Sequence, residues 1–168
     1  MVSYGSYIAY IGTYNIGNYA NNLFLELSMN ICKLSTLENL PSLPSLFKLS
    51  LNDNNLTSIT GLAEKCPVLL ELYLSGNKKI SSLDQLDEIS KIKSLLKIEI
   101  EGCGVQDTEG ENYRDKIFKK FPHLQVVDSY NEQGEEMPDD DDEEEEDEVA
   151  DRNSIIKSYF LLNSSLRM

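Results

Sequence analysis

The sequence predicts an α/β solenoid, with a curved parallel β-sheet on the concave face, mixed helical and extended segments on the convex side, and a C-terminal cap. Three observations predict it. An apolar pattern recurs along the chain at intervals of 22, 23, 26 and 29 residues. Each copy places apolar residues two positions apart, as on one face of a short strand. Segments with helical spacing or with prolines alternate with these copies.

The recurring unit is Leu-x-x-Leu-x-Leu-x-x-Asn/Cys-x-Leu, the pattern of a leucine-rich repeat. The apolar strand positions are Phe24, Leu27, Met29, Leu46, Leu49, Leu51, Leu69, Leu72, Leu74, Leu95, Ile98 and Ile100, and a short copy begins at Leu124 and Val127. The repeat's Asn/Cys positions are Cys32, Asn54, Asn77 and Cys103. Such side chains can bond backbone groups that a sharp turn leaves unpaired, so we assign all four a structural turn role, with both cysteines buried.

The returns between strands differ from one repeat to the next. Between residues 34 and 43, leucines recur every three positions around two prolines, which predicts an extended or tight-turn return. Apolar residues at helical spacing in 59–66 and 113–121 predict two helical returns. The second helix is amphipathic, and we expect its lysines to face water: Lys116, Lys119 and Lys120.

We divide the chain into four parts. Residues 1–22 are an atypical, uncharged segment with five of the nine tyrosines, which either forms a hairpin over Phe24, Leu27 and Met29 or is foreign to the fold. Residues 23–134 are the repeat domain, with a cap at about 112–130. Residues 135–148 are an acidic low-complexity run, and residues 149–168 are an atypical tail that we expect to be disordered.

Cap residues are assigned structural roles. We expect Tyr113, Phe118 and Asp128 to seal the last repeat. The Tyr113 hydroxyl and the Asp128 carboxylate are expected to form a hydrogen bond.

Charge is concentrated in the acidic run. The net charge is −14, and residues 135–148 hold 12 acidic side chains and no basic one. Such a field attracts lysine- and arginine-rich partners over about a Debye length and repels nucleic-acid backbones. We therefore expect basic partner proteins and no direct nucleic-acid binding. The expected contact residues in the run are Asp139, Asp140, Asp141, Asp142, Glu143, Glu144, Glu145 and Glu146.

A second candidate surface is the set of outward side chains on the strands. Strand alternation turns Glu71, Tyr73, Glu99 and Glu101 outward, and Asp128 is expected to continue this face. The tyrosine ring and the carboxylates could together receive a partner's Arg or Lys side chain. The alternative is an ordinary solvated sheet face.

The residues do not favour catalysis. The single histidine, His123, lies beside the cap's Pro122, and no nucleophile–base pair, phosphate-binding glycine loop or metal-ligand spacing can be assembled. We therefore expect no enzyme activity, no cofactor and no metal. No apolar stretch approaches the length of a membrane span, and three unpaired cysteines indicate a reducing compartment. We expect a monomer.

Two stretches of the sequence carry a family resemblance. The run LAEKCPVLLELYLSGNK (62–78) and the segment NYRDKIFKKFPHLQVVD (112–128), followed by the acidic run, are similar to the acidic leucine-rich nuclear phosphoprotein family. The resemblance implies a non-enzymatic, histone-binding, chaperone-like regulator of chromatin and transcription in the nucleus, with shuttling to the cytoplasm. Two alternatives stay open: a protein phosphatase type 2A inhibitor, or a structural spliceosomal ribonucleoprotein subunit, because a spliceosomal leucine-rich protein has a similar cap.

Overall fold

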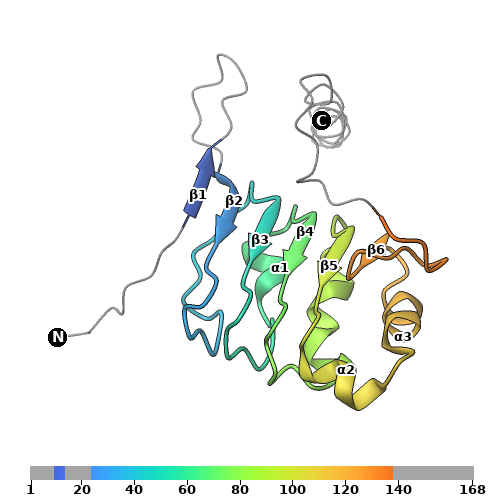
Figure 1. Cartoon of the computed structure of the whole chain (residues 1–168). Helices are drawn as coiled ribbons and strands as arrows, with labels where there is room; N and C mark the ends of the chain where they lie inside the picture. Colours follow the sequence, from blue (N-terminus) through green and yellow to red (C-terminus); the bar gives the residue numbers. More distant parts are fainter. Residues whose placement is uncertain (1–9, 14–23, 138–168) are drawn as a thin grey trace, which may run out of the picture. The chain divides into compact units, whose positions relative to one another are not determined.

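The structure is a computed structural model that describes residues 10–13 and 24–137 (Figure 1). Its strands form one six-stranded sheet in the order β1-β2-β3-β4-β5-β6. The elements, in chain order, are β1 (Tyr10–Thr13), β2 (Phe24–Ser28), β3 (Lys48–Ser50), α1 (Leu62–Lys65), β4 (Glu71–Tyr73), the 3-10 helix η1 (Leu83–Lys91), β5 (Lys97–Glu99), α2 (Gly104–Glu109), α3 (Tyr113–Lys120) and β6 (Val126–Val127).

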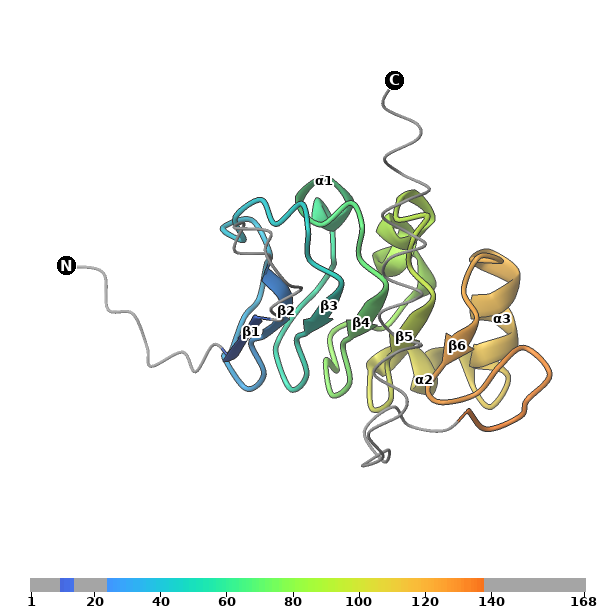
Figure 2. The ribbon, with the colours of Figure 1, turned by 90° about the horizontal axis from the view of Figure 1, so that it is seen from above.

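The strands from β2 to β6 run parallel, one from each repeat. Their central residues stand in register across the sheet: Leu27, Leu49, Leu72, Ile98 and Val127. In β3, β4 and β5 the central residue is buried and its two neighbours are half-buried. Figure 2 shows α1 and η1 on the same side of the row of strands. The predicted solenoid of short parallel strands is confirmed.

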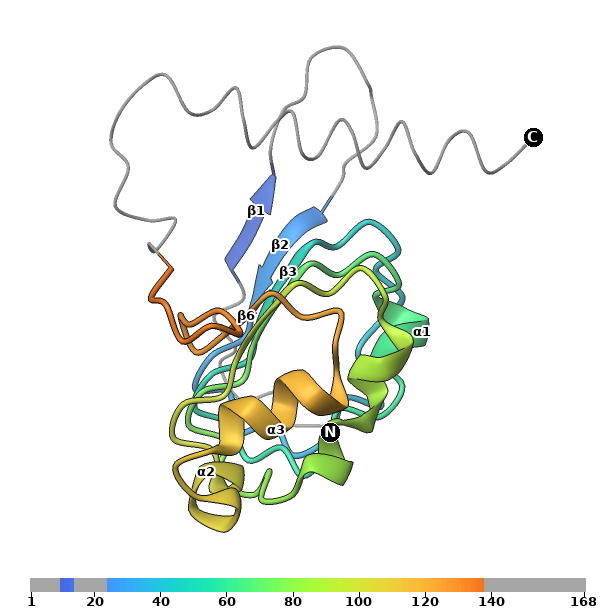
Figure 3. The same cartoon turned by 90° about the vertical axis from the view of Figure 1, so that its right-hand side faces the viewer.

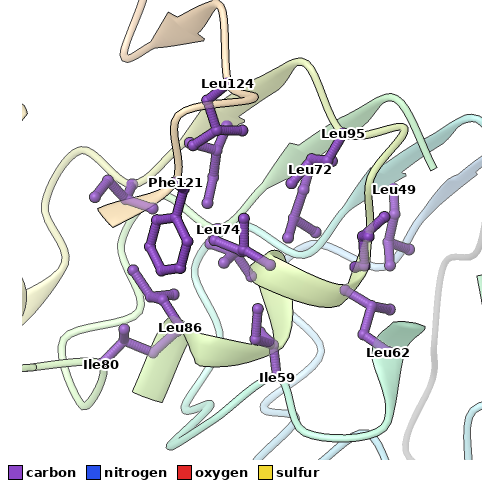
Figure 4. Close-up of a cluster of buried hydrophobic side chains, with 14 of the residues drawn as sticks. Leu49, Ile59, Leu62, Leu72, Leu74, Ile80, Leu86, Leu95, Phe121 and Leu124 are labelled. Carbon is purple, nitrogen blue, oxygen red and sulfur yellow. The ribbon is translucent and has the colours of Figure 1, made fainter. Parts of the chain in front are cut away.

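The core fills the space between the strands and the returns. Leu49, Leu72 and Leu74 are fully buried and meet apolar residues of the returns, such as Ile59 and Leu86 (Figure 4). A fully buried leucine contributes about 1.5–3 kcal/mol relative to an exposed one. Because each repeat buries its apolar residues against its neighbours, stability depends on stacking.

The first two returns agree with the sequence in part. Residues 34–43 contain no helix, and turns close at Leu40 N–H to Leu37 O (3.0 Å) and Leu46 N–H to Leu43 O (3.1 Å), as the sequence predicts. The second return is helical only over Leu62–Lys65, because Cys66 precedes Pro67 and leaves the helical conformation, with φ −131° and ψ 66°.

The third return is a helix that the sequence analysis does not name. Helix η1 begins after Ser82, whose backbone N–H donates to Oε1 of Gln85 at 2.9 Å in a capping box. Its buried apolar residues, Leu86 and Ile89, lie three positions apart, which is the spacing of one face of a 3-10 helix.

The C-terminal end of the stack is covered by α3, which lies across the last coil when the stack is viewed along its length (Figure 3). Tyr113, Ile117 and Phe118 of α3 are buried, as its amphipathic pattern predicts. Lys116 and Lys119 are exposed. Lys120 differs from the prediction, because its ammonium forms ion pairs with Asp84 and Asp87 of η1, each at 2.8 Å, and is half-buried there.

At the N-terminal end, β1 pairs antiparallel with β2. Tyr10 stands opposite Ser28 and Ile11 opposite Leu27, with an irregularity between Gly12 and Thr13. Residues 10–13 thus pair with β2 itself, and the predicted hairpin within residues 1–22 stays a prediction. The rest of residues 1–22, the acidic run from residue 138 and the tail lie outside the described residues, so the proposed boundaries of those segments stay predictions.

Candidate protein-binding surface

The outward side chains of β2–β5 and the residues that follow them form a surface that we name the strand face. The strand register arranges them in three rows. The first row is Glu26, Lys48, Glu71 and Lys97; the second is Ser28, Ser50, Tyr73 and Glu99; the third, by the same spacing, is Asn30, Asn52, Ser75 and Glu101.

Tyr73 lies at the centre of a charged cluster on the strand face. The ammonium groups of Lys48 and Lys97 stand 5.0 and 5.5 Å from the centroid of its ring. Its hydroxyl donates to Oε2 of Glu71 at 2.8 Å. Lys48 pairs with Glu71 at 3.5 Å and Lys97 with Glu99 at 3.2 Å. The cluster holds the ring in one orientation and compensates most of its own charge.

This geometry changes the expected use of Tyr73. The sequence analysis expects the ring to receive a partner's cation, but the chain itself places two lysines there. A partner's cation would have to displace one of them. Glu101, in the next row, is exposed, and its carboxylate has no ion pair within the described residues. Among the three glutamates predicted as contact residues on the strand face, Glu101 is therefore the one whose carboxylate is most accessible to a partner.

Sequence reasoning turns Lys48 and Lys97 outward on this face, but it misses their contact with the Tyr73 ring. Both lysines stand directly opposite Glu71 on the neighbouring strands. Oppositely charged residues at facing positions of adjacent strands attract each other. The repeat register therefore held the signal for the Lys48–Glu71 pair and for two lysines beside Tyr73, whereas Lys97 pairs with Glu99 of its own strand.

Apart from Glu26 and Lys48 in its first row, the strand face carries neutral polar groups over β2, β3 and the residues that follow them. Oδ1 of Asn30 accepts hydrogen bonds from the Ser50 hydroxyl (2.8 Å) and the Asn52 backbone N–H (2.7 Å). Oδ1 of Asn52 is buried without a hydrogen-bond partner among the described residues. In the second and third rows, the face therefore changes from small neutral polar groups over β2–β3 to aromatic and charged groups over β4–β5.

Turn residues build the ladder that keeps the strands in register. Asn54 donates to the carbonyls of Met29 (2.9 Å) and Leu51 (2.8 Å), and Asn77 donates to those of Leu51 (3.0 Å) and Leu74 (2.6 Å). The Cys103 thiol donates to the Leu74 carbonyl at 3.2 Å. Each of these side chains satisfies backbone groups of the preceding repeat.

Cys32 departs from its predicted buried turn role. It is half-buried, and its thiol donates to the carbonyl of Asn30, two residues away, at 3.2 Å. The reason is its place in the stack, because β1 precedes it as an antiparallel strand and offers no parallel turn for the thiol to reach. Burial raises the pKa of Cys66 to about 11 and that of Cys103 to about 12, which keeps both thiols protonated.

The cap contains the expected hydrogen bond. The Tyr113 hydroxyl donates to Oδ2 of Asp128 at 2.6 Å, and Oδ1 of Asp128 accepts from the Ile100 backbone N–H at 2.6 Å. Gln106 and Arg114 also donate to the tyrosine oxygen, at 2.8 and 3.1 Å. Burial raises the pKa of Asp128, and the hydrogen bonds that its carboxylate accepts oppose this shift. The pKa of Tyr113 is also raised, mainly by burial and secondly by its hydrogen bond to Asp128.

Asp128 is therefore not an outward position of the strand face, and that prediction is wrong. Asp128 and Ser129 have φ angles of 49° and 65°. Two successive left-handed residues turn the chain out of the strand, so the alternation of side chains ends at Val127. The carboxylate then points into the cap, where it is buried.

The predicted acidic contact residues, from Asp139 to Glu146, lie outside the described residues. Across residues 10–13 and 24–137, no group of His, Cys, Asp and Glu side chains is arranged to hold a metal ion. In the same ranges, no helix has both the length and the apolar character needed to cross a bilayer.

Known proteins show the same repeat. A sequence profile described as leucine-rich repeat matches residues 5–144. Among solved structures, the chain is similar to the Drosophila melanogaster SNF/U2A′ complex, at 28% identity and a TM-score of 0.60, over 74% of this chain and 79% of that one. It is also similar to the Mex67 leucine-rich repeat domain of Chaetomium thermophilum, at 28% identity and a TM-score of 0.42, over 55% of this chain and 58% of that one. A further match is the Chaetomium Mex67:Mtr2 subunits, at 27% identity and a TM-score of 0.44, over 56% and 58%.

Leucine-rich repeat domains mediate protein–protein interactions, and their stacked strands present a continuous surface for a partner. The family profile covers most of the chain, and the parallel strands, the asparagine ladder and the buried leucines have the geometry of the repeat. This chain therefore belongs to the leucine-rich repeat family.

Proposed function

We propose that this chain is a non-enzymatic scaffold that binds a folded protein on its strand face, as a structural subunit of a two-protein complex. The observation that carries the proposal is the similarity to the SNF/U2A′ complex over 74% of this chain, at 28% identity. U2A′ forms a complex with SNF, and we propose that this chain binds a partner of the SNF kind. This role corresponds to the ribonucleoprotein-subunit alternative of the sequence analysis.

The chemistry of the strand face supports the choice of surface. Its side chains stand on strands whose backbone is fixed by neighbours on both sides, so little conformational entropy remains to be lost on binding. Tyr73 is an aromatic residue held between two lysines, and tyrosines of this kind are enriched among residues that dominate binding energy. The neutral residues Ser50 and Asn52 on the neighbouring repeat allow a partner to approach closely without burying an unpaired charge there.

Calorimetric titration of the full chain with purified Drosophila SNF tests the proposal. Glu101→Arg on the strand face should weaken binding about tenfold, because it replaces an unpaired carboxylate with a bulky opposite charge. The matched control is Glu111→Arg, because Glu111 is also exposed but lies before α3, away from the strand face. Equal affinities for the two variants, or no binding by the wild type, would contradict the proposal.

A second candidate is histone binding in the nucleus, the role implied by the resemblance to the acidic leucine-rich nuclear phosphoproteins. The observation that favours it is the run of 12 acidic residues within 135–148. Neutralising Asp139–Glu148 to Asn and Gln should abolish most binding to purified core histones at low salt, because the attraction is electrostatic. Retained affinity in that variant would end the histone proposal.

The phosphatase alternative rests on the family resemblance alone. It predicts inhibition of purified protein phosphatase type 2A by the full chain. Since the strand face would make the contact, Glu101→Arg should relieve the inhibition and neutralising the acidic run should not. Nuclear localisation with shuttling also stays a proposal, and imaging of the tagged full chain tests it.

A further inference from the structure

One turn position is shared by four repeats and is left-handed in all of them. The position follows the strand register by three residues, and its occupants are Ile31, Asp53, Gly76 and Gly102. Their φ angles are 56°, 54°, 76° and 70°. Glycine adopts this conformation freely, and aspartate tolerates it. Isoleucine does not, because its branched Cβ collides with the backbone there.

The turn at Ile31 is held in this strained shape by the rest of the structure. The Ile31 backbone N–H donates to the Asn52 carbonyl at 3.0 Å. Oδ1 of Asn54 accepts from the backbone N–H groups of Cys32 and Leu34, both at 3.0 Å. These bonds fix the backbone whichever residue stands at position 31, so isoleucine is strained and glycine would not be.

Burial among the described residues does not compensate the strain. The Ile31 side chain is 75% exposed, which is the largest exposure among the large hydrophobic residues of the described ranges. Within those ranges, nothing offsets the strain of the Ile31 backbone or the exposure of its apolar side chain to water. Strained positions persist where the strain serves a function.

We infer that Ile31 is an anchor that inserts into an apolar pocket on the protein that covers the strand face. Ile31 follows Asn30 of the strand face directly, so a partner on that face reaches it at the rim. Lys33 is exposed in the same turn, and Asp53 is exposed at the corresponding position of the neighbouring repeat, so the two charges beside Ile31 balance. The apolar side chain, rather than a net charge of the turn, is therefore the feature that a partner on the strand face would use.

The test rests on one substitution that should stabilise the free chain and weaken its binding to the partner. Ile31→Gly should raise the melting temperature of the free chain by about 2 °C or more, because it removes the strain. The same change should raise the Kd for purified Drosophila SNF at least about tenfold, because it removes a buried apolar side chain. Asp53→Gly is the matched control at the same turn position, with an unchanged Kd expected.

The outcomes separate this inference from the proposed function on which it rests. Wild-type binding that Ile31→Gly leaves unchanged overturns the anchor and leaves the proposed function standing. A lower melting temperature for Ile31→Gly overturns it too, because Ile31 would then serve the free chain. Absence of SNF binding by the wild type ends both proposals. Sedimentation of the wild type and of Ile31→Gly tests for self-association. If the wild type is a dimer and the variant is a monomer, Ile31 binds a second copy of this chain, and the partner stated above is wrong.

Discussion

A single asparagine side chain at each inner turn serves backbone groups of two repeats at once. Asn77 donates to the carbonyls of Leu51 and Leu74, and its Oδ1 accepts from the Leu56 backbone N–H at 3.1 Å. The side chain is fully buried, so no water replaces it when it is removed. The cost of such a loss is set by the groups left unsatisfied rather than by the bonds themselves.

Asn77→Ala is therefore expected to lower the free energy of unfolding by about 2 kcal/mol, because the buried Leu56 N–H loses its acceptor and the carbonyls of Leu51 and Leu74 each lose one of their donors. Urea unfolding followed by circular dichroism measures the change. Asn55→Ala is the control, because Asn55 is exposed one position beyond a ladder residue, and its change should stay within about 0.5 kcal/mol. Similar losses in the two variants would show that the ladder does not stabilise the turns.

His123, the chain's one histidine, links stability to pH. Partial burial lowers the pKa of His123 most, and the charge of Lys93 lowers it further. Hydrogen bonds to the carbonyls of Ile89 and Ile92 act in the opposite direction and raise the pKa, but they do not cancel the shift. Its Nε2 is buried without a partner among the described residues, so the charged ring is disfavoured. The folded state thus binds the proton less tightly than the unfolded state. The stabilising contribution is present above about pH 6.5, and it is lost as the pH falls through the folded pKa.

We expect the single histidine resonance in proton NMR to titrate below the usual midpoint for histidine. We also expect the wild type to lose more stability than His123→Gln between pH 7.5 and the folded pKa. A midpoint at or above the usual value, or parallel pH profiles for the two proteins, would contradict this linkage.

At the scale of elements, the cap joins α2, α3, β5 and β6 through one tyrosine. Tyr113 of α3 bonds Asp128, which in turn holds the backbone after β5, and Gln106 of α2 bonds the same hydroxyl. Tyr113→Phe should lower the free energy of unfolding by about 1 kcal/mol, the size of one net hydrogen bond. Tyr130→Phe is the matched control, because its ring stacks on Arg114 at 4.2 Å and the substitution keeps that contact. Identical melting curves for wild type and Tyr113→Phe would contradict the role of this bond.

Elements with a clear periodic pattern, namely the repeated strands and helix α3, could be predicted from the sequence, whereas the end of the last strand could not. Leu49, Leu72 and Ile98 recur at matching positions, so their common register follows from the pattern. Asp128 was assigned outward because strand alternation was extended past Val127, where two left-handed residues end it. The Tyr73 cluster was predicted only in part, because which cation reaches the ring depends on the conformations of long side chains on neighbouring strands.

At the scale of the whole molecule, the two proposed binding modes differ in their dependence on salt. The chain has 15 basic residues against 29 − 12 = 17 acidic ones once the run at 135–148 is set aside. Partner binding on the strand face should therefore change little between about 50 and 200 mM salt, apart from a modest effect on association rate. Histone binding through the acidic run should fall steeply over the same range. Surface plasmon resonance at several salt concentrations measures both, and a steep salt dependence for SNF would point to the run rather than to the strand face.

The central claim is that the strand face binds the partner, and amide chemical-shift mapping tests it most directly. The labelled full chain is titrated with unlabelled SNF, and perturbed amides are assigned. We predict that the largest perturbations fall on β2–β5 and on the turn at Ile31, with little change in η1 and α3. Perturbations concentrated on η1 and α3, or on residues 139–148, would contradict the claim.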